Sequence, residues 1–347
     1  MPVDALDKYY LALTLLVTTG YQLLGFAIAW TFQFDKITDF TGGEHLHLTW
    51  LTRATHVILG SNFFLLAILT LCLNGVYHAR NIVASVFVMI WATRLAGFLL
   101  FRVLKTGSDT RFDDIRSHFF KFLGFWVGQI VWVWIVSLPV TILNSPAVSP
   151  SGGVQPNFGT GTDIAGIILW VIGWSIESLA DVQKFKYKQT HPPKDQPTTY
   201  GIWKYSRHPP YFGEILCWWG IWLIALSASS GRSEPHRAQL GAIVSPLFTM
   251  VLLIFGSGIP TAQKPTAQKF FLLSHGPKPT HANAWPNYQR YLSRTSVLIP
   301  MPPQIYAKLP QFIKTLFLLD LPIYRFDEER DGKRAIMEER QKIDNNA

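Results

Sequence analysis

Seven uninterrupted apolar runs constrain this chain more than any other feature of its sequence. Read in windows of about 19 residues, the length that suits a membrane-spanning helix, the runs occupy residues 9–31, 57–75, 81–101, 121–144, 163–180, 211–229 and 240–258. Only 15% of the 347 residues are charged, against roughly 25% in soluble domains. The sequence therefore predicts an all-α fold, a polytopic membrane helix bundle of about seven transmembrane helices.

The distribution of lysine and arginine predicts the orientation, because cytoplasmic loops of membrane proteins carry an excess of both. With seven spans, the loops between runs one and two, three and four, and five and six share one side with the chain after residue 258. Those three loops hold Lys36, Arg53, Arg102, Lys105, Arg111, Arg116, Lys121, Lys184, Lys186, Lys188, Lys194, Lys204 and Arg207, whereas the opposite side holds Lys8, Arg80, Arg232 and Arg237. We therefore expect the C-terminal tail in the cytoplasm. The net charge of +9 then reflects this bias and attraction to anionic headgroups, not nucleic acid binding.

The rest of the chain predicts one membrane domain over residues 1–303 and a cytoplasmic tail over residues 304–347. After Gly258 the chain is polar and proline-rich to about Pro303, and mixed charges over residues 326–347 are typical of a solvated or frayed helix. Glycine and proline predict an irregular loop over residues 144–163, on the non-cytoplasmic side. Cys72 and Cys217 fall in or beside apolar runs, as small buried hydrophobes do, and two cysteines provide no disulfide framework or metal site.

The first of three polar clusters on the predicted cytoplasmic side begins with Arg94, inside the third run, and continues over residues 102–116. Arg94 lies about two helical turns from the end of that run, and ionisable residues inside a span mark a functional site by default. Pairing with a carbonyl group of a neighbouring helix is the alternative for Arg94. The Gly-Ser-Asp-Thr-Arg-Phe-Asp-Asp turn that starts at Gly107 is equally suited to capping a helix.

The second cluster places Glu177 and Asp181 four residues apart, on one face of the fifth predicted helix. Two such carboxylates repel each other unless something binds between them. Ribose hydroxyl groups, an amine or a basic side chain would each fit. Alternatively, the two negative charges are neutralised by the nearby Lys184, Lys186 and Lys188.

The third cluster is the stretch from Tyr200 to Glu214, where polar side chains run directly into an apolar span. Two prolines after His208 restrict the backbone and could start the next helix. Tyr211 and Glu214, three residues apart, then share a helix face. Arg207 and His208 suit a diphosphate, and Tyr211 and Glu214 suit a hydrogen-bonded ring or amide.

Four motifs carry a resemblance to a known family. They are Glu177-x3-Asp181-x-Gln183, Tyr205-Ser-Arg-His-Pro-x-Tyr-Phe-Gly-Glu214, Arg102-Val-Leu-Lys-x-Gly-Ser-Asp-x-Arg-Phe-Asp113 and Tyr288-x2-Tyr291-x3-Thr295-x3-Ile299-Pro300. Over residues 30–303 the chain resembles membrane-embedded reductases of the steroid 5α-reductase superfamily, and within it the DUF1295 branch. The resemblance implies a helix bundle in the endoplasmic reticulum that opens to the cytoplasm. It also implies that the bundle binds NADPH and reduces an activated carbon–carbon double bond in a hydrophobic lipid, sterol or polyprenoid.

By the same resemblance, the cofactor contacts are Asp181, Tyr205, Arg207, His208, Tyr211 and Glu214, with Lys188 as a phosphate-binding residue and Tyr291 closing the pocket from the tail. Arg94 and Tyr211 are the candidate catalytic residues, and no metal is implied. Three positions depart from the family pattern. Pro210 replaces a usual asparagine, Trp91 stands where the steroid-reducing branch has an acid tyrosine, and Gln263 stands where relatives often have glutamate.

Two alternatives remain beside the reductase, whose partners would be a hydrophobic small-molecule substrate and the lipid bilayer. Isoprenylcysteine and phospholipid methyltransferases resemble the chain more distantly, so S-adenosylmethionine-dependent methylation of an amphiphile is the first. A non-catalytic sterol-binding membrane protein is the second, and Pro210 and Trp91 favour it.

Overall fold

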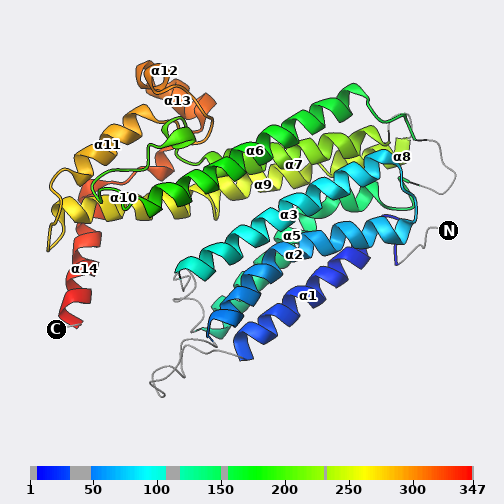
Figure 1. The fold of residues 1–347 in the computed structure, drawn as a ribbon, viewed down its shortest axis with the longest axis horizontal. Helices are drawn as coiled ribbons and strands as arrows, with labels where there is room; N and C mark the ends of the chain where they lie inside the picture. Colours follow the sequence, from blue (N-terminus) through cyan, green and yellow to red (C-terminus); the bar gives the residue numbers. More distant parts are fainter. Residues whose placement is uncertain (1–5, 32–47, 107–117, 150–154, 230–232, 346–347) are drawn as a thin grey trace. The chain divides into compact units, whose positions relative to one another are not determined.

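The structure, a computed structural model, describes residues 6–31, 48–106, 118–149, 155–229 and 233–345. Every regular element of more than one residue in these ranges is a helix, which confirms the all-α prediction (Figure 1). The chain divides into two compact units, of which the first comprises Met1–Trp170 and Trp218–Phe248 and the second comprises Val171–Cys217 and Thr249–Ala347.

The first unit contains α1 (Leu11–Thr31), α2 (Leu48–Asn74), α3 (Ala79–Thr106), α5 (Phe119–Leu143) and α8 (Ser233–Gly241). The second contains η3 (Gly201–Lys204), α10 (Ile259–His275), α11 (Ala284–Arg294), α12 (Pro303–Lys308), α13 (Gln311–Leu318), η4 (Pro322–Tyr324), η5 (Glu328–Gly332) and α14 (Lys333–Asn345). Three helices contribute residues to both units, namely α6 (Gly161–Gln189), α7 (Pro209–Ser227) and α9 (Val244–Phe255).

Five helical stretches of the described chain are long and apolar enough to cross a membrane. They are Leu11–Thr31, Ala79–Phe98, Phe119–Leu143, Gly161–Gln189 and Ser233–His275, and a shorter apolar helix covers Ser61–Asn74. The protein is therefore a multi-pass membrane protein. The predicted count of seven spans is not confirmed. One reason is that α7, which covers the sixth predicted run, begins with two prolines, a tyrosine and a glutamate, which make its first turns polar.

The predicted loop over residues 144–163 and the stretch after Gly258, predicted only to be polar and proline-rich, both contain helical residues. The predicted loop over residues 144–163 ends at Gly161, where α6 begins. The predicted polar, proline-rich stretch after Gly258 contains α10 and α11, and α10 continues through Pro265. Proline opposes a helix interior locally, but burial of aromatic side chains on both helices stabilises this pair.

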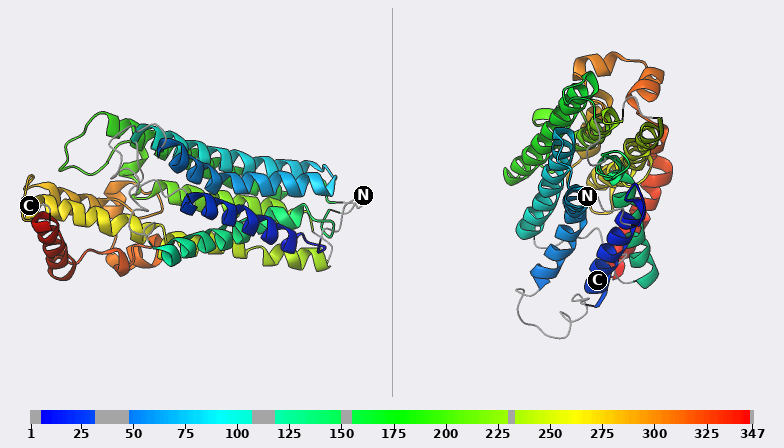
Figure 2. Two further views of the ribbon diagram at one scale, coloured as in Figure 1. Left: turned by 90° about the horizontal axis from the view of Figure 1, so that it is seen from below. Right: turned by 90° about the vertical axis from the view of Figure 1, so that its right-hand side faces the viewer.

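Helices α1, α2, α3 and α5 of the first unit pack side by side, as Figures 1 and 2 show from different directions. An aromatic core joins them. The ring of Phe63 meets the rings of Trp91 and Trp132 edge to face, with centroids 5.2 and 4.8 Å apart, and Trp91 meets Trp218 at 5.0 Å. Trp91 is only 1% exposed and is thus part of this core.

A buried ion pair, not foreseen from the sequence, anchors the start of α6 in the first unit. Nη2 of Arg80 donates to Oδ2 of Asp163 at 2.7 Å, and Nε donates to Oδ1 at 2.9 Å. Both side chains are at most 1% exposed. Ser227 and the backbone N–H of Thr160 also donate to the carboxylate. A buried charge needs such partners, and an acid in the first turn of a helix is favoured by the helix dipole.

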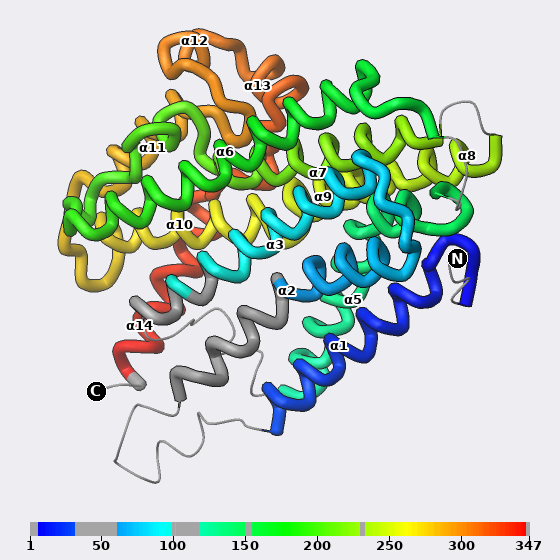
Figure 3. The backbone as a smooth tube through the Cα atoms, turned by 45° about the vertical axis from the view of Figure 1, so that its right-hand side comes forward, coloured from blue at the N-terminus to red at the C-terminus, as the bar shows by residue number. Residues whose placement is uncertain are grey.

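Helices α6 and α7 run antiparallel (Figure 3). Their backbones approach closely at two places. In the first unit, a Cβ atom added to Gly166 would lie 2.6 Å from the carbonyl oxygen of Gly220. In the second unit, a Cβ atom added to Gly173 would lie 2.5 Å from the carbonyl oxygen of Gly213. Both contacts are reciprocal. The glycines on each helix are about two turns apart and face one seam, and such small residues let helices approach closely in a membrane.

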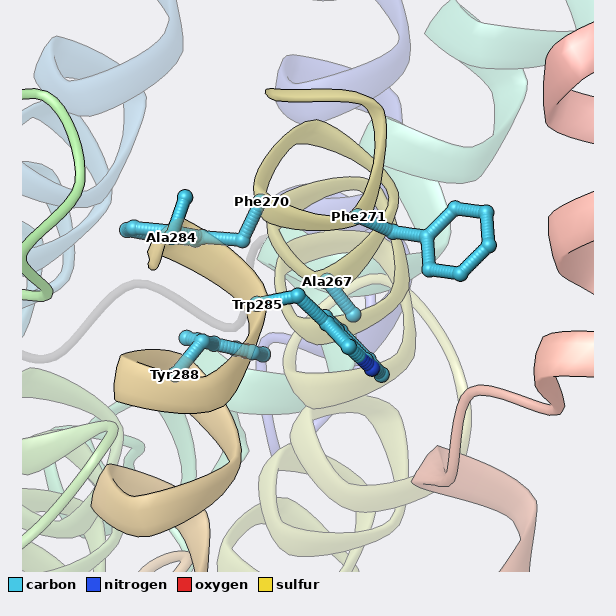
Figure 4. Close-up of a cluster of buried hydrophobic side chains, with 6 residues drawn as sticks. All are labelled: Ala267, Phe270, Phe271, Ala284, Trp285 and Tyr288. Atoms are coloured by element: carbon cyan, nitrogen blue, oxygen red, sulfur yellow. The ribbon is translucent and has the colours of Figure 1, made fainter. Parts of the chain in front are cut away.

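An aromatic cluster between α10 and α11 forms part of the core of the second unit (Figure 4). Phe270 stacks on Tyr288 with ring centroids 4.7 Å apart, and Phe271 meets Trp285 edge to face at 5.5 Å. Gln289 and Trp285 both donate to Glu328, just before α14. The polar C-terminal region is thereby tied to a hydrophobic core of its own unit.

Replacement of Gly213 by alanine is expected to force α6 and α7 apart, because the new methyl group would lie 2.5 Å from the carbonyl oxygen of Gly173. A backbone oxygen cannot move aside by a change of side-chain rotamer. Overpacking of this kind costs about 1–3 kcal/mol. Thermal unfolding of the detergent-solubilised protein measures the loss. Gly97→Ala on α3 is the matched control, because no atom lies within 4 Å of the added Cβ. Equal melting temperatures for the two variants would contradict the proposed importance of the seam.

Candidate functional site

The second unit contains every residue that the resemblance assigns to a cofactor. Asp181 and Lys188 lie on α6, Tyr291 lies on α11, and the remaining five lie in the chain that leads into α7 or in its first turns, at Tyr205, Arg207, His208, Tyr211 and Glu214. Glu177 and Asp181 lie on one helix four residues apart, as predicted. Arg94 lies on α3, in the first unit.

The linker before α7 is fixed to α6 by its backbone. Gly201 has a φ of +59°, and a side chain there would collide with Gln183. The amide oxygen of Gln183 accepts from the N–H of Ile202 at 2.8 Å, and the indole N–H of Trp203 donates to the carbonyl of Ala180 at 3.0 Å. Lys184 lies over the Trp203 ring, with Nζ 4.5 Å from its centroid. Gln183, quoted above as part of a motif, therefore positions the linker.

The other side of the linker pairs with the chain that follows α11. The N–H of Arg207 donates to the carbonyl of Ser296 at 2.8 Å, within a parallel bridge between Ser206 and Ser296. The hydroxyl group of Ser206 donates to the carbonyl of Leu298 at 2.8 Å. Tyr291, predicted to close the pocket, donates its hydroxyl proton to the carbonyl of Trp203 at 3.1 Å. Burial raises the pKa of Tyr291 well above its usual range, so it remains a donor.

The guanidinium group of Arg207 is buried and engaged with protein atoms. Nε donates to the carbonyl of Thr295 at 2.8 Å, and Nη2 donates to the carbonyl of Leu292 at 3.0 Å and to Asp320 at 3.3 Å. Tyr306 donates to the same carboxylate at 2.6 Å. These contacts hold the C-terminal chain. They give Arg207 a structural role, since two of its three nitrogen atoms donate to protein acceptors, and its contact with a diphosphate stays a prediction.

His208 is held in its neutral form. Its ring stacks on that of Tyr211, with centroids 5.4 Å apart, and its Nε2 lies 3.1 Å from Oε1 of Gln263. Burial lowers the pKa of His208 to about 3, and the charges of Arg207 and Lys184 act in the same direction, against the hydrogen bond to Gln263. Because a carbonyl oxygen only accepts, Nε2 carries the proton in this arrangement and Nδ1 is an acceptor.

A buried carboxylate lies at the α6–α7 contact. Glu177 is 4% exposed, and its Cβ would lie 3.0 Å from a Cβ added to Gly213. Asp181, one turn further along α6, and Glu214, on α7, are half-buried, whereas Lys188 near the end of α6 is exposed. Pro209 and Pro210 are the first residues of α7, as the sequence predicts.

Two residues of this arrangement were missed by sequence reasoning. Asp320 and Tyr306 complete the partners of Arg207. The signal for Asp320 was present, because it is the only acidic residue between 303 and 325. Of the first polar cluster, residues 107–116 and the side chains of Arg102 and Lys105 lie outside the described part of the chain.

Apolar spans together with a polar arrangement at the start of α7 define the class, a multi-pass membrane protein with a candidate small-molecule site. Residues 45–271 match the profile of a family described as a protein of unknown function, DUF1295, and the chain belongs to this family. No curated protein and no solved structure matches the chain. Arg207 and His208 lie inside the matched residues, whereas Asp320 and Tyr306 lie beyond them.

Replacement of Asp320 by alanine is expected to destabilise the protein by about 3 kcal/mol, because it leaves a buried guanidinium group without its counter-charge. Asp320→Asn keeps a hydrogen-bond acceptor and is expected to lower the free energy of unfolding by less. Chemical unfolding followed by circular dichroism measures both. Arg334→Ala breaks the exposed pair of Arg334 with Glu338 and is expected to change little. A loss no larger than in this control would refute the anchoring role of Asp320.

The pKa of His208 also predicts how stability depends on pH. The unfolded chain binds a proton at His208 below about pH 6.5, whereas the folded chain does so only near pH 3. The contribution of His208 to the free energy of unfolding therefore falls as pH falls from about 6.5 towards 3. His208→Gln is expected to lose less stability between pH 7 and pH 5 than the wild type, as measured by thermal unfolding at both values. Parallel losses in the two proteins would show that His208 is not held neutral.

Proposed function

We propose that this protein is a membrane-embedded, NADPH-dependent reductase of a carbon–carbon double bond in a hydrophobic lipid, sterol or polyprenoid substrate. The observation that carries the proposal is the convergence, within one unit, of the buried acid Glu177, the neutral His208 stacked on Tyr211, and the basic residues around them. DUF1295 membership and the resemblance to steroid 5α-reductases support the same conclusion.

The charges of the second unit support an assignment of the residues that would hold the phosphates of NADPH. Arg207 is committed to Asp320 and to two carbonyl groups, and His208 is neutral. Exposed lysines on the last turns of α6 and in the linker include Lys184, Lys186, Lys188 and Lys204. The proposal therefore assigns the phosphates to these lysines, with Lys188 at the 2′-phosphate. Arg207 acts through the linker as a positioning residue.

The polar residues of α6 and α7 suit the uncharged parts of the cofactor. Asp181 would accept from ribose hydroxyl groups, and Glu214 from the amide group of the nicotinamide. Nδ1 of His208 adds an acceptor at the start of α7. Pro210, at the position of the usual asparagine, supplies no side-chain hydrogen bond, so Glu214 must orient the amide group alone.

The bound cofactor would supply a hydride to the substrate double bond. The protein would then stabilise negative charge that develops on a conjugated oxygen. Tyr211 is the proposed proton donor in the second unit, and its stacking on His208 fixes the ring. Arg94 stays a proposed catalytic residue on the strength of its place inside an apolar span, which is costly without a function. The proposed location is the endoplasmic reticulum, with the site facing the cytoplasm.

The cofactor assignment predicts how the purified protein binds nucleotides. Lys188→Ala is expected to weaken NADPH binding about tenfold, the loss that one charge-assisted hydrogen bond represents, and to leave NADH binding unchanged. Lys333→Ala, which removes an exposed lysine from α14, is the matched control.

Isothermal titration of the wild type with NADPH, NADH and S-adenosylmethionine identifies the cofactor class. Heat released by S-adenosylmethionine alone would favour the methyltransferase. Tight NADPH binding without oxidation in the presence of extracted membrane lipids would favour the non-catalytic alternative.

A further inference from the structure

We infer that residues 303–325, from α12 to η4, form an interfacial membrane anchor, and that α13 inserts its apolar side into the boundary between lipid headgroups and acyl chains. This inference concerns the bilayer as a partner of the C-terminal region. It does not depend on the proposed enzymatic activity.

The apolar side of α13 faces away from the protein. Phe312, Leu316 and Phe317 share about half of the helix circumference and are 67%, 69% and 64% exposed. Leu318, on the opposite side, is buried, and Lys314 lies there over the ring of Tyr306, with Nζ 4.5 Å from its centroid. A soluble helix shows the reverse pattern, with its apolar side inward. An outward apolar side therefore indicates an apolar partner.

The contacts of this segment within its unit place it where two apolar helices end. Asp320, just beyond α13, pairs with Arg207, two residues before α7 begins. Tyr324 donates to the carbonyl of Ile254 at 2.8 Å, one residue before α9 ends. After α9 the chain bends and becomes polar. The segment is thus fixed at the level where the apolar parts of both helices stop, which is the level of the headgroups.

The exposed apolar surface continues from α9 to this segment. Val251 and Phe255 on α9 are exposed, as lipid-facing residues of a span are. Ile323, next to the tyrosine that binds the end of α9, is exposed as well. A bilayer that covers α9 would therefore also reach η4 and α13.

The charges of the segment favour a lipid surface over a second protein. Lys308 and Arg325 are exposed. Asp320, the only acidic residue between 303 and 325, is buried against Arg207. The exposed charges are therefore all basic and lie beside aromatic and aliphatic side chains. This combination is typical of helices that lie on anionic membranes.

Site-directed spin labelling tests the inference in the full-length protein, reconstituted in nanodiscs of phosphatidylcholine with and without phosphatidylserine. The parent is Cys72→Ser, because Cys217 is 1% exposed and would not react. Labels are placed at Leu316→Cys and Phe317→Cys. Val251→Cys is the lipid-facing reference, and Gln311→Cys, an exposed polar position at the start of α13, is the matched control.

The labels at 316 and 317 are expected to relax more readily with oxygen, which concentrates in lipid, than with a water-soluble nickel complex, as at 251. The label at 311 is expected to show the opposite preference.

Lys308→Glu with Arg325→Glu is expected to reduce the oxygen preference at 316 mainly when phosphatidylserine is present. Greater access of nickel at 316 and 317 would overturn the inference in favour of solvent exposure. Low access of both reagents would overturn it in favour of a covering protein. Melting temperatures matching the parent establish that each labelled protein is folded.

Discussion

The close contact between α6 and α7 is the constraint on which the rest of the second unit depends. Gly173 and Gly213 let the two backbones meet, and that distance brings Glu177 of α6 against the first turns of α7. In a membrane there is little hydrophobic force between helices, so close packing of small residues must supply the stability. A larger side chain at the seam would separate the acidic residues of α6 from Tyr211 and Glu214. The candidate site is therefore a consequence of two glycines that carry no chemistry themselves.

The linker before α7 shows how a polar motif can be both structural and functional. Its backbone is held by Gln183 on one side and by the chain after α11 on the other. Arg207 completes this arrangement by donating to carbonyl groups on that chain and to Asp320. The proposed ligand contacts near the linker are His208 and the half-buried Tyr211 and Glu214. Arg207 thus fixes the geometry of the linker, whereas the proposed function assigns the phosphates to the lysines nearby.

Much of the fold could be predicted from the sequence, because apolar runs and helix-starting prolines are local signals. The first run coincides closely with α1, and Pro209 begins α7 as expected. The partners of Arg80 and Arg207 could not be predicted, because each pair joins residues 83 or 113 positions apart. A charged residue in or beside an apolar run needs a partner, but the pattern of the run does not show which distant residue that partner is. The helices after Gly258 were missed for a related reason, since their stability comes from aromatic packing between α10 and α11 rather than from apolar runs.

In each unit, a buried arginine fixes one end of an apolar helix by donating to an aspartate and to backbone carbonyl groups. Arg80, near the start of α3, donates to Asp163 and to the carbonyl groups of Pro156 and Asn157. Arg207, just before α7, donates to Asp320 and to two carbonyl groups of a returning chain. An arginine suits this task because its planar fork satisfies several acceptors at once, which a lysine cannot do in a fixed geometry. In the second unit the returning chain lies outside the part that matches the DUF1295 family. The orientation of Arg207 in this protein therefore depends on residues that the family profile does not include.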